Sequence, residues 1–184
     1  MPAAKRISKE AIIDAAAAVL RSGGFEAINA RSVAKALGCS TQPIYLSFRN
    51  MEELKSALTQ RAIEQHTQRV RESLRAHEGR DSRYSSYGMG FVQFAAQEKQ
   101  LFRWLYLEDN QPGRHQEDVL EPEIIRTVMD EFGYDEVTAR AFHRDMTYYS
   151  YGLAILANTG HLALTETELR EAFRREFRAL AAYY

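Results

Sequence analysis

Apolar residues recur along most of the chain at the three- and four-residue spacing of amphipathic helices. One complete stripe near the N-terminus consists of Ile12, Ala15, Ala16, Val19 and Leu20. No segment of useful length alternates between apolar and polar positions, which is the pattern of a half-buried strand. We therefore predict an all-α fold with helices over residues 8–22, 30–37, 41–47, 51–77, 82–97, 99–108, 117–132, 136–158 and 166–183.

Polar residues and glycines mark the ends of these helices. Four residues placed directly before a predicted helix can accept a hydrogen bond from its first turn: Ser8, Asn29, Ser40 and Thr165. Asn50 and Glu53 have the spacing of a capping box at the start of the long helix over 51–77. Glycines that permit a tight helix end follow at 24, 38, 133 and 160, and residues 109–113 read as a turn.

Residues 30–48 have the layout of a helix-turn-helix, in which a two-turn helix and a short turn precede a second helix. Ala34 is small enough for the two helices to cross closely, and Gly38 supplies the turn. Ile44 and Phe48 are expected to face the core. The polar and aromatic residues Thr41, Gln42, Tyr45 and Ser47 then face outward, where they can contact base edges and phosphates. A plain helical hairpin with solvated polar residues has the same local pattern.

Charge and aromatic residues are distributed unevenly along the chain. Residues 1–60 hold eight Lys or Arg against five Asp or Glu, whereas residues 61–184 hold sixteen against twenty. Only three of the twenty aromatic residues lie in the first 60. A small basic head joined to an acidic, aromatic-rich body suits a head that binds a polyanion, although an imbalance of this size also arises by chance.

Residues 7–63 resemble the N-terminal domain of the TetR family of bacterial transcriptional repressors. The resemblance rests on the following residues: Ile12, Ala15, Ala16, Leu20, Gly24, Phe25, Val33, Ala34, Leu37, Gly38, Ile44, Tyr45, Phe48, Asn50 and Leu54. It implies an N-terminal three-helix DNA-binding head at 1–50 and a larger helical body at 51–184 that binds an effector and dimerises. The body matches the family only in its length and helical character.

The resemblance assigns DNA contacts to the following residues: Arg31, Ser32, Thr41, Gln42, Pro43, Tyr45, Leu46, Ser47, Arg49 and Lys55. Arg31 and Ser32 occupy phosphate-contacting positions, and Thr41 and Gln42 occupy base-reading positions. Tyr45 matches a tyrosine that usually contacts phosphate. The family usually has lysine where this chain has Met51, so Arg49 or Lys55 is expected to compensate for the missing charge, or the grip on phosphate is weaker.

Aromatic residues in the body suggest an effector pocket. The residues that would line it are Tyr87, Phe91, Phe94, Trp104, Phe142, Met146 and Tyr149. Ordinary core packing explains the same residues without a ligand. The last two helices are expected to form a dimeric four-helix bundle, with packing inside one chain as the alternative. The predicted interface residues are Tyr151, Leu169, Phe173, Phe177 and Leu180.

These features favour a cytoplasmic, homodimeric repressor that a small apolar or aromatic effector releases from a palindromic operator in double-stranded DNA. Control by a protein partner, without a small effector, is one alternative. An all-helical enzyme is another, but the chain has no catalytic triad layout, phosphate-binding loop or metal-spaced cluster. No cofactor, metal site or membrane partner is expected, and the single cysteine, Cys39, fits a reducing compartment.

Overall fold

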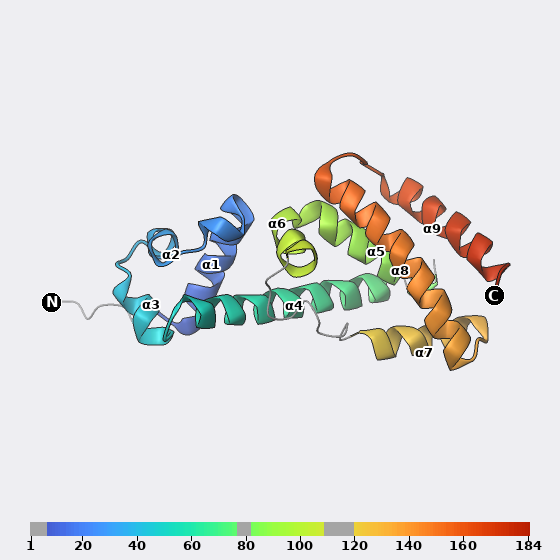
Figure 1. Cartoon of the computed structure of the whole chain (residues 1–184), viewed down its shortest axis with the longest axis horizontal. Helices are drawn as coiled ribbons and strands as arrows, with labels where there is room; N and C mark the ends of the chain where they lie inside the picture. Colours follow the sequence, from blue (N-terminus) through green and yellow to red (C-terminus); the bar gives the residue numbers. More distant parts are fainter. Residues whose placement is uncertain (1–6, 77–81, 109–119) are drawn as a thin grey trace. The chain divides into compact units, whose positions relative to one another are not determined.

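The computed structural model describes residues 7–76, 82–108 and 120–184, and its regular structure there is helical throughout (Figure 1). The predicted all-α fold is confirmed. The α-helices are α1 (Lys9–Gly23), α2 (Ala30–Leu37), α3 (Gln42–Ser47), α4 (Met51–Ala76), α5 (Arg83–Gln97), α6 (Lys99–Phe102), α7 (Glu121–Phe132), α8 (Glu136–Thr159) and α9 (Glu166–Ala181). A 3₁₀ turn, η1 (Phe25–Ala27), follows α1, and a π-helix, η2 (Arg103–Leu107), follows α6.

The predicted helix limits differ from the observed ones by one or two residues in most cases. The helix expected over 99–108 instead changes at Arg103 from α to π geometry. The turn predicted at 109–113 and the first residues of the helix expected over 117–132 lie outside the described residues. Within the described ranges, no helix has both the length and the apolar character that a membrane crossing requires.

Most predicted caps are present. Ser8 Oγ accepts the Ala11 N–H at 3.1 Å, and Thr165 forms a reciprocal capping box with Glu168. Ser40 does not cap α3, so that prediction is wrong. The residue at the N-cap is Thr41, whose side chain makes no capping bond.

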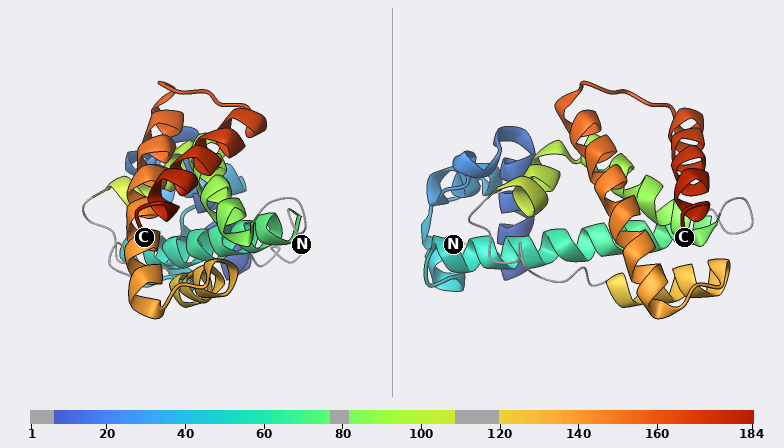
Figure 2. Two further views of the ribbon diagram at one scale, coloured as in Figure 1. Left: turned by 90° about the vertical axis from the view of Figure 1, so that its right-hand side faces the viewer. Right: turned by 45° about the vertical axis from the view of Figure 1, so that its right-hand side comes forward.

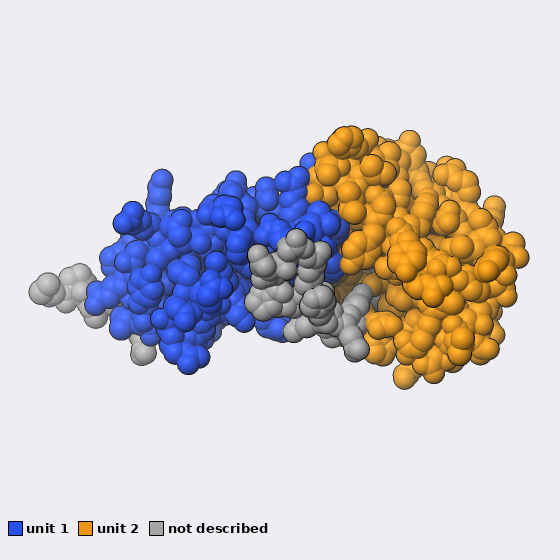
Figure 3. All heavy atoms as spheres, viewed as in Figure 1, with its two compact units in different colours: residues 1–65, 98–115 blue, residues 66–97, 116–184 orange. Residues whose placement is uncertain are grey.

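The chain forms two compact units, which Figure 3 shows in different colours. Unit 1 comprises residues 1–65 and 98–115, and unit 2 comprises 66–97 and 116–184. Packing therefore extends the N-terminal unit beyond the predicted boundary at residue 50, through the first half of α4, and adds α6 and η2 to it. The functional boundary at residue 50 stays a prediction.

In unit 1, the core beneath the helix-turn-helix consists of apolar side chains from α1, α2, α3 and α4. The most deeply buried are Ile12, Leu20, Val33, Ile44, Phe48, Leu54 and Leu58. Trp104 of η2 completes this unit, since its ring packs edge-on against Phe25 and its indole N–H donates to Thr59 Oγ1 at 3.1 Å. These contacts hold the π-helix and the first half of α4 together.

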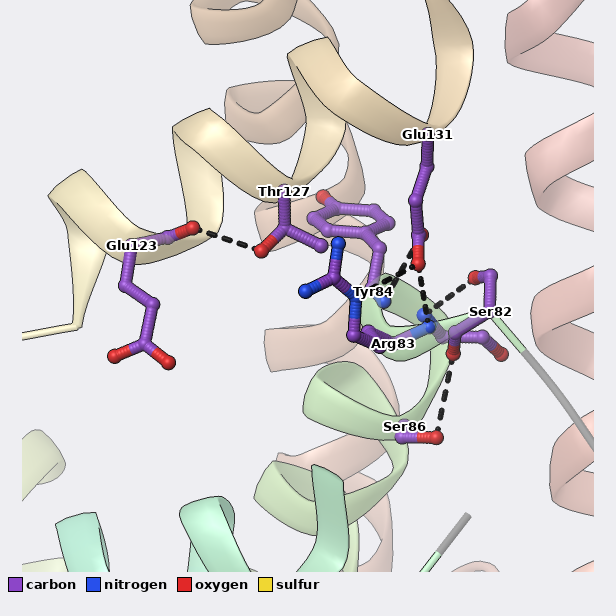
Figure 4. A network of polar contacts seen from close by, with 8 residues as sticks. Ser82, Arg83, Tyr84, Ser86, Glu123, Thr127 and Glu131 are labelled. Atoms are coloured by element: carbon purple, nitrogen blue, oxygen red, sulfur yellow. Dashed lines mark hydrogen bonds and ion pairs between the residues drawn. The ribbon is translucent and has the colours of Figure 1, made fainter. Parts of the chain in front are cut away.

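In unit 2, α5 packs against α7, α8 and α9 (Figure 2). Glycine at position 88 lets α5 and α9 approach closely, because a Cβ there would overlap the buried ring of Phe173. The N-terminus of α5 is held by α7, whose Glu131 carboxylate accepts the Arg83 N–H at 2.9 Å and the Tyr84 N–H at 3.3 Å (Figure 4). Glu131 thereby satisfies two N–H groups that a helix start leaves free.

Two residues predicted for the dimer interface belong to this core instead. Leu169 and Phe173 on α9 are almost fully buried within one chain, so their apolar surface is not available to a partner. Phe177 is half-buried, with its ring 4.7 Å from that of Phe132 and 5.4 Å from that of Phe142. These three residues of α9 thus pack inside the protomer, and their part in a dimer interface stays a prediction.

Candidate nucleic-acid interface

The helix-turn-helix is built by local hydrogen bonds. Asn29 caps α2 by accepting the N–H groups of Arg31 and Ser32 at 3.1 and 3.0 Å. Gly38 ends α2 with a φ of 65°, a left-handed conformation that favours glycine. Ile44 then anchors α3 in the core, with 1% of its surface exposed. One face of α3 is fixed inward, so its other face is presented to solvent.

The predicted base-reading residues divide by exposure. Gln42, Tyr45 and Leu46 are exposed. Leu46 has 79% of its surface accessible, and Tyr45 has 54%. Thr41, Pro43 and Ser47 are half-buried at the margins of α3. The structure therefore brings an amide, a phenol and an aliphatic side chain to one outward surface.

The two predicted phosphate contacts on α2 differ in what their side chains already do. Arg31 is exposed at the start of the helix. The Ser32 hydroxyl donates to the Ala27 carbonyl at 2.6 Å and accepts the Asn29 N–H at 3.1 Å. A phosphate at Ser32 would have to replace the Ala27 carbonyl as acceptor of the hydroxyl proton, whereas Arg31 can approach a phosphate without this cost.

At the start of α4, Glu53 organises a small charged group. Asn50 Oδ1 accepts the Glu53 N–H at 2.9 Å, as predicted, but the Glu53 carboxylate accepts the backbone N–H of Arg49 at 2.8 Å, one residue before the cap. It also pairs with the Arg49 guanidinium at 3.2 Å. These bonds from Arg49 lower the pKa of Glu53. The ionised carboxylate therefore orients Arg49, whose side chain remains 89% exposed.

Lys55, the other predicted substitute for the missing lysine, has a different role. Its Nζ lies 4.6 Å from the centre of the Phe25 ring and 3.1 Å from Glu52 Oε1. Its side chain is only 21% exposed. The cation is thus engaged in a cation–π contact within unit 1. Between these two residues, Arg49 is the one that remains available to a phosphate.

The residues predicted to line an effector pocket do not form one group. Trp104 belongs to unit 1. In unit 2, Phe142 packs with Phe132, Tyr134 and Phe177, and Tyr149 donates its hydroxyl to the Ala172 carbonyl at 3.3 Å. These contacts account for Phe142 and Tyr149 as parts of the core. The Tyr87 ring lies 6.0 Å from that of His143, and Met146 is buried.

Phe91 and Phe94 form a second group around a histidine that sequence reasoning missed. His66 on α4 is buried, with its ring 4.4 Å from that of Phe94 and 6.1 Å from that of Phe91, and Phe91 lies 4.9 Å from Tyr151. A signal for His66 existed in the chain: Leu58, Ala62, His66 and Val70 share a four-residue spacing, and all four are buried.

No group of three or more His, Cys, Asp or Glu side chains that could hold a metal ion occurs in the described parts of the chain. Two histidines of unit 2 lie within hydrogen-bonding distance of hydroxyl groups. His143 Nδ1 lies 3.0 Å from the Tyr84 hydroxyl, and His161 Nδ1 lies 3.0 Å from Thr159 Oγ1. Burial raises the pKa of Tyr84, so its hydroxyl stays protonated as a hydrogen-bonding group.

Residues 12–58, which build the helix-turn-helix and the start of α4, match the family model of the bacterial regulatory proteins of the tetR family. This part of the chain is thus similar to the tetR family. Members of this family are DNA-binding transcriptional regulators, typically repressors, and they typically dimerise. They act by binding rather than by catalysis.

Solved structures share the fold over almost the whole chain. A protein of unknown function from Rhodococcus sp. RHA1 is 18% identical with a TM-score of 0.74, covering 99% of this chain and 97% of that one. The fatty acid degradation regulator FadR from Bacillus halodurans is 18% identical with a TM-score of 0.60, over 95% and 98%. A TetR family protein from Vibrio parahaemolyticus is 17% identical with a TM-score of 0.58, over 93% and 97%. No curated protein matches the sequence.

Proposed function

We propose that the chain is a homodimeric repressor, with its DNA-binding domain at 1–50 and its effector and dimerisation domain at 51–184. Each protomer places α3 in a major groove of a palindromic operator, and a small apolar or aromatic effector releases the dimer. The observation that carries this proposal is the orientation of α3. Ile44 is buried, while Gln42 and Leu46 are exposed on the opposite side of α3 and Tyr45 is exposed on its flank.

The contacts follow from the chemistry of these side chains. Gln42 can form two hydrogen bonds with the edge of an adenine, and the Tyr45 hydroxyl can donate to a phosphate. Arg31 and Arg49 are exposed cations suited to the flanking phosphates. Thr41, Pro43 and Ser47 are proposed as marginal contacts, since each is half-buried. Lys55 is a weaker candidate because its cation already faces Phe25 and Glu52.

Selection of bound duplexes from a random pool tests DNA recognition. We expect enrichment of a palindrome, since a symmetric dimer presents the same helix to both half-sites. Gln42→Ala should weaken binding by about 1–3 kcal/mol per half-site and relax preference at one base pair. Gln68→Ala, an exposed glutamine on α4, is the matched control and should leave binding unchanged. Failure to enrich any sequence, or an equal loss on all sequences with Gln42→Ala, would contradict the assignment.

The proposed dimer uses an exposed face of α8. Tyr148, Gly152 and Ile155 follow one another at four- and three-residue spacing and are exposed, with Tyr148 68% accessible. Leu156 adds apolar surface beside them. A Cβ at Gly152 would meet no atom within 4 Å, so a partner helix has room to approach the backbone there. Exposed apolar residues around a glycine in a helix interior support close packing against a second copy.

For the effector, the group of His66, Phe91, Phe94 and Tyr151 is the better candidate within unit 2. Three aromatic rings would provide apolar walls, and the imidazole and phenol would provide polar groups that orient a ligand. A thermal-shift screen of small apolar and aromatic compounds tests this. A hit should raise Tm and weaken operator binding, and Phe91→Leu should reduce the shift for that compound. A regulator controlled by a protein partner would show no such hit.

A further inference from the structure

An aliphatic side chain stands at the centre of the proposed DNA-reading face. Leu46 is 79% exposed, while α3 as a whole is anchored by the buried Ile44. A single exposed apolar residue on a protein surface needs no explanation. Its position on this helix does, because every neighbouring exposed side chain on α3 can form hydrogen bonds and Leu46 cannot.

Helical geometry places Leu46 beside Gln42. With about 100° of rotation per residue, both lie about 160° from Ile44, on the two sides of the line directly opposite the core. Tyr45 and Pro43 lie about 100° from Ile44, on the flanks of the helix. The observed exposure agrees with this arrangement, since Gln42 and Leu46 are exposed and Pro43 is half-buried. The two central residues on the outward face of α3 are therefore one amide and one aliphatic side chain.

We propose that Leu46 reads the C5 methyl group of a thymine in each half-site. This inference rests on the proposed function, in which α3 enters the major groove. The C5 methyl of thymine is the apolar group that a base edge presents there, and the other edges present donors and acceptors. The leucine side chain has no hydrogen-bond donor or acceptor, so covering a donor or acceptor of a base would leave that group unpaired. Contact with a methyl group is favourable for leucine, because it removes apolar surface of both groups from water.

The neighbouring glutamine makes the same region of the half-site rich in A·T pairs. Gln42 is suited to an adenine, which it can contact through two hydrogen bonds. Four residues advance a helix by about 6 Å, so the two side chains reach base pairs one or two steps apart. We expect the selected half-site to contain a thymine whose methyl group faces Leu46, next to the base pair that Gln42 reads.

Replacing thymine by deoxyuracil tests this directly, because uracil lacks only the C5 methyl group. With the selected operator, uracil at one thymine position should weaken binding by wild-type protein about fourfold in one half-site and about fifteenfold in both. In Leu46→Ala the same substitution should have no effect, while uracil at other thymines behaves as in the wild type. Leu46→Met should retain the sensitivity, because its side chain also buries a methyl group.

Val137→Ala provides the matched control, since Val137 is also 79% exposed but lies on α8. It should keep the full wild-type response to uracil. A 5-methylcytosine at the sensitive position distinguishes the methyl group from the rest of the base. Wild-type protein should bind DNA with 5-methylcytosine at this position more tightly than DNA with cytosine there, whereas Leu46→Ala should bind both with the same affinity.

The proposal is overturned if uracil substitution weakens wild-type and Leu46→Ala protein to the same extent at every thymine, or weakens neither. Either result with a specific operator leaves the proposed function intact and removes only the role of Leu46. Absence of any sequence-specific binding would instead overturn the proposed function. Since Leu46 is exposed, its variants should keep the thermal stability of the wild type, which separates loss of contact from loss of fold.

Discussion

At the scale of single residues, the environment of each side chain decides which of several chemically similar residues can act. Arg49 and Lys55 are both cations near the start of α4. Arg49 stays exposed while Glu53 orients it, whereas Lys55 lies over the Phe25 ring. A cation–π contact within the unit lowers the availability of Lys55 to DNA without changing its charge. Composition gives both residues equal weight, and only their surroundings separate them.

Gly88 shows the same dependence on surroundings. A Cβ at this position would overlap the ring of Phe173, which is itself buried and cannot move aside easily. We expect Gly88→Ala to lower the free energy of unfolding by about 1–3 kcal/mol, because overpacking between α5 and α9 outweighs the higher helix propensity of alanine. Chemical denaturation, monitored by circular dichroism, measures this.

A compensating variant makes this test specific. Gly88→Ala combined with Phe173→Leu should be less unstable than the sum of the two single variants, since the smaller side chain makes room for the added methyl group. Simple additivity, or a Gly88→Ala protein as stable as the wild type, would show that α5 and α9 can separate without cost.

At the scale of elements, the residues at helix termini allow most helix starts to be predicted from the sequence. Ser8, Asn29, Asn50 and Thr165 all accept hydrogen bonds at the starts of helices, as their positions in the sequence predict. Ser40 does not, because the turn brings Thr41 to that place. Caps that depend on neighbours three residues away are predictable, but the exact entry into a short helix depends on how the turn packs.

The N-terminus of α4 gives a prediction about DNA affinity. Met51→Lys adds a cation at a helix start whose free N–H groups already favour an anion. It should tighten binding almost equally on operator and random DNA, because phosphates carry no sequence information. Each new phosphate contact should steepen the slope of log affinity against log salt by about 0.9, so a dimer should gain up to about 1.8. Affinity measured between about 50 and 200 mM salt reports this slope.

Met51→Gln is the matched control, since it has a similar length without the charge and should leave the slope unchanged. A slope that also stays unchanged with Met51→Lys would mean that the side chain does not reach the backbone, or that Arg49 already neutralises this phosphate. Comparing Met51→Lys with the wild type in an Arg49→Gln background separates these two explanations. If Arg49 neutralises this phosphate, Met51→Lys should steepen the slope once Arg49 is removed. If the side chain at position 51 does not reach the backbone, the slope should still not change.

At the scale of the whole molecule, the distribution of buried and exposed apolar residues bears on the proposed association of two copies. The apolar stripe on α9 is largely buried in the core of unit 2, where Leu169 and Phe173 lie. The open apolar surface is on α8, around Gly152. A charge introduced on α8 should therefore break the dimer, whereas a charge on the buried side of α9 should damage the protomer itself.

Ile155→Glu tests the dimer directly. We expect monomers at micromolar concentration by light scattering, with helicity retained, because Ile155 is 39% exposed and the charge is desolvated only when a partner covers it. Phe177→Glu should instead lower the stability of the protomer, since its ring packs against Phe132 and Phe142. Arg126→Glu, an exposed change on α7, is the control and should remain dimeric. A dimeric Ile155→Glu protein would move the interface away from this face of α8.

The all-α fold, most helix limits, most caps and the helix-turn-helix could be predicted from the amino-acid sequence alone. These features depend on spacing within a helix or on hydrogen bonds to residues three positions away, so local order along the chain is sufficient to predict them. The sequence also indicated that Gln42 and Tyr45 face outward on α3, because a short helix with one strongly apolar side has a single stable orientation against a core, whereas Thr41 and Ser47 are half-buried.

The sequence could not predict which aromatic residues share a cluster or which apolar helix face stays exposed, because both depend on how the helices pack. Trp104 contacts Phe25 and Thr59 in unit 1 rather than the rings of unit 2, and His66 joins Phe91 and Phe94. The stripes on α8 and α9 look equivalent in the sequence, yet one is exposed and the other is buried. An amphipathic pattern predicts that one face of a helix is buried. Which element packs against that face depends on contacts between residues far apart in the chain.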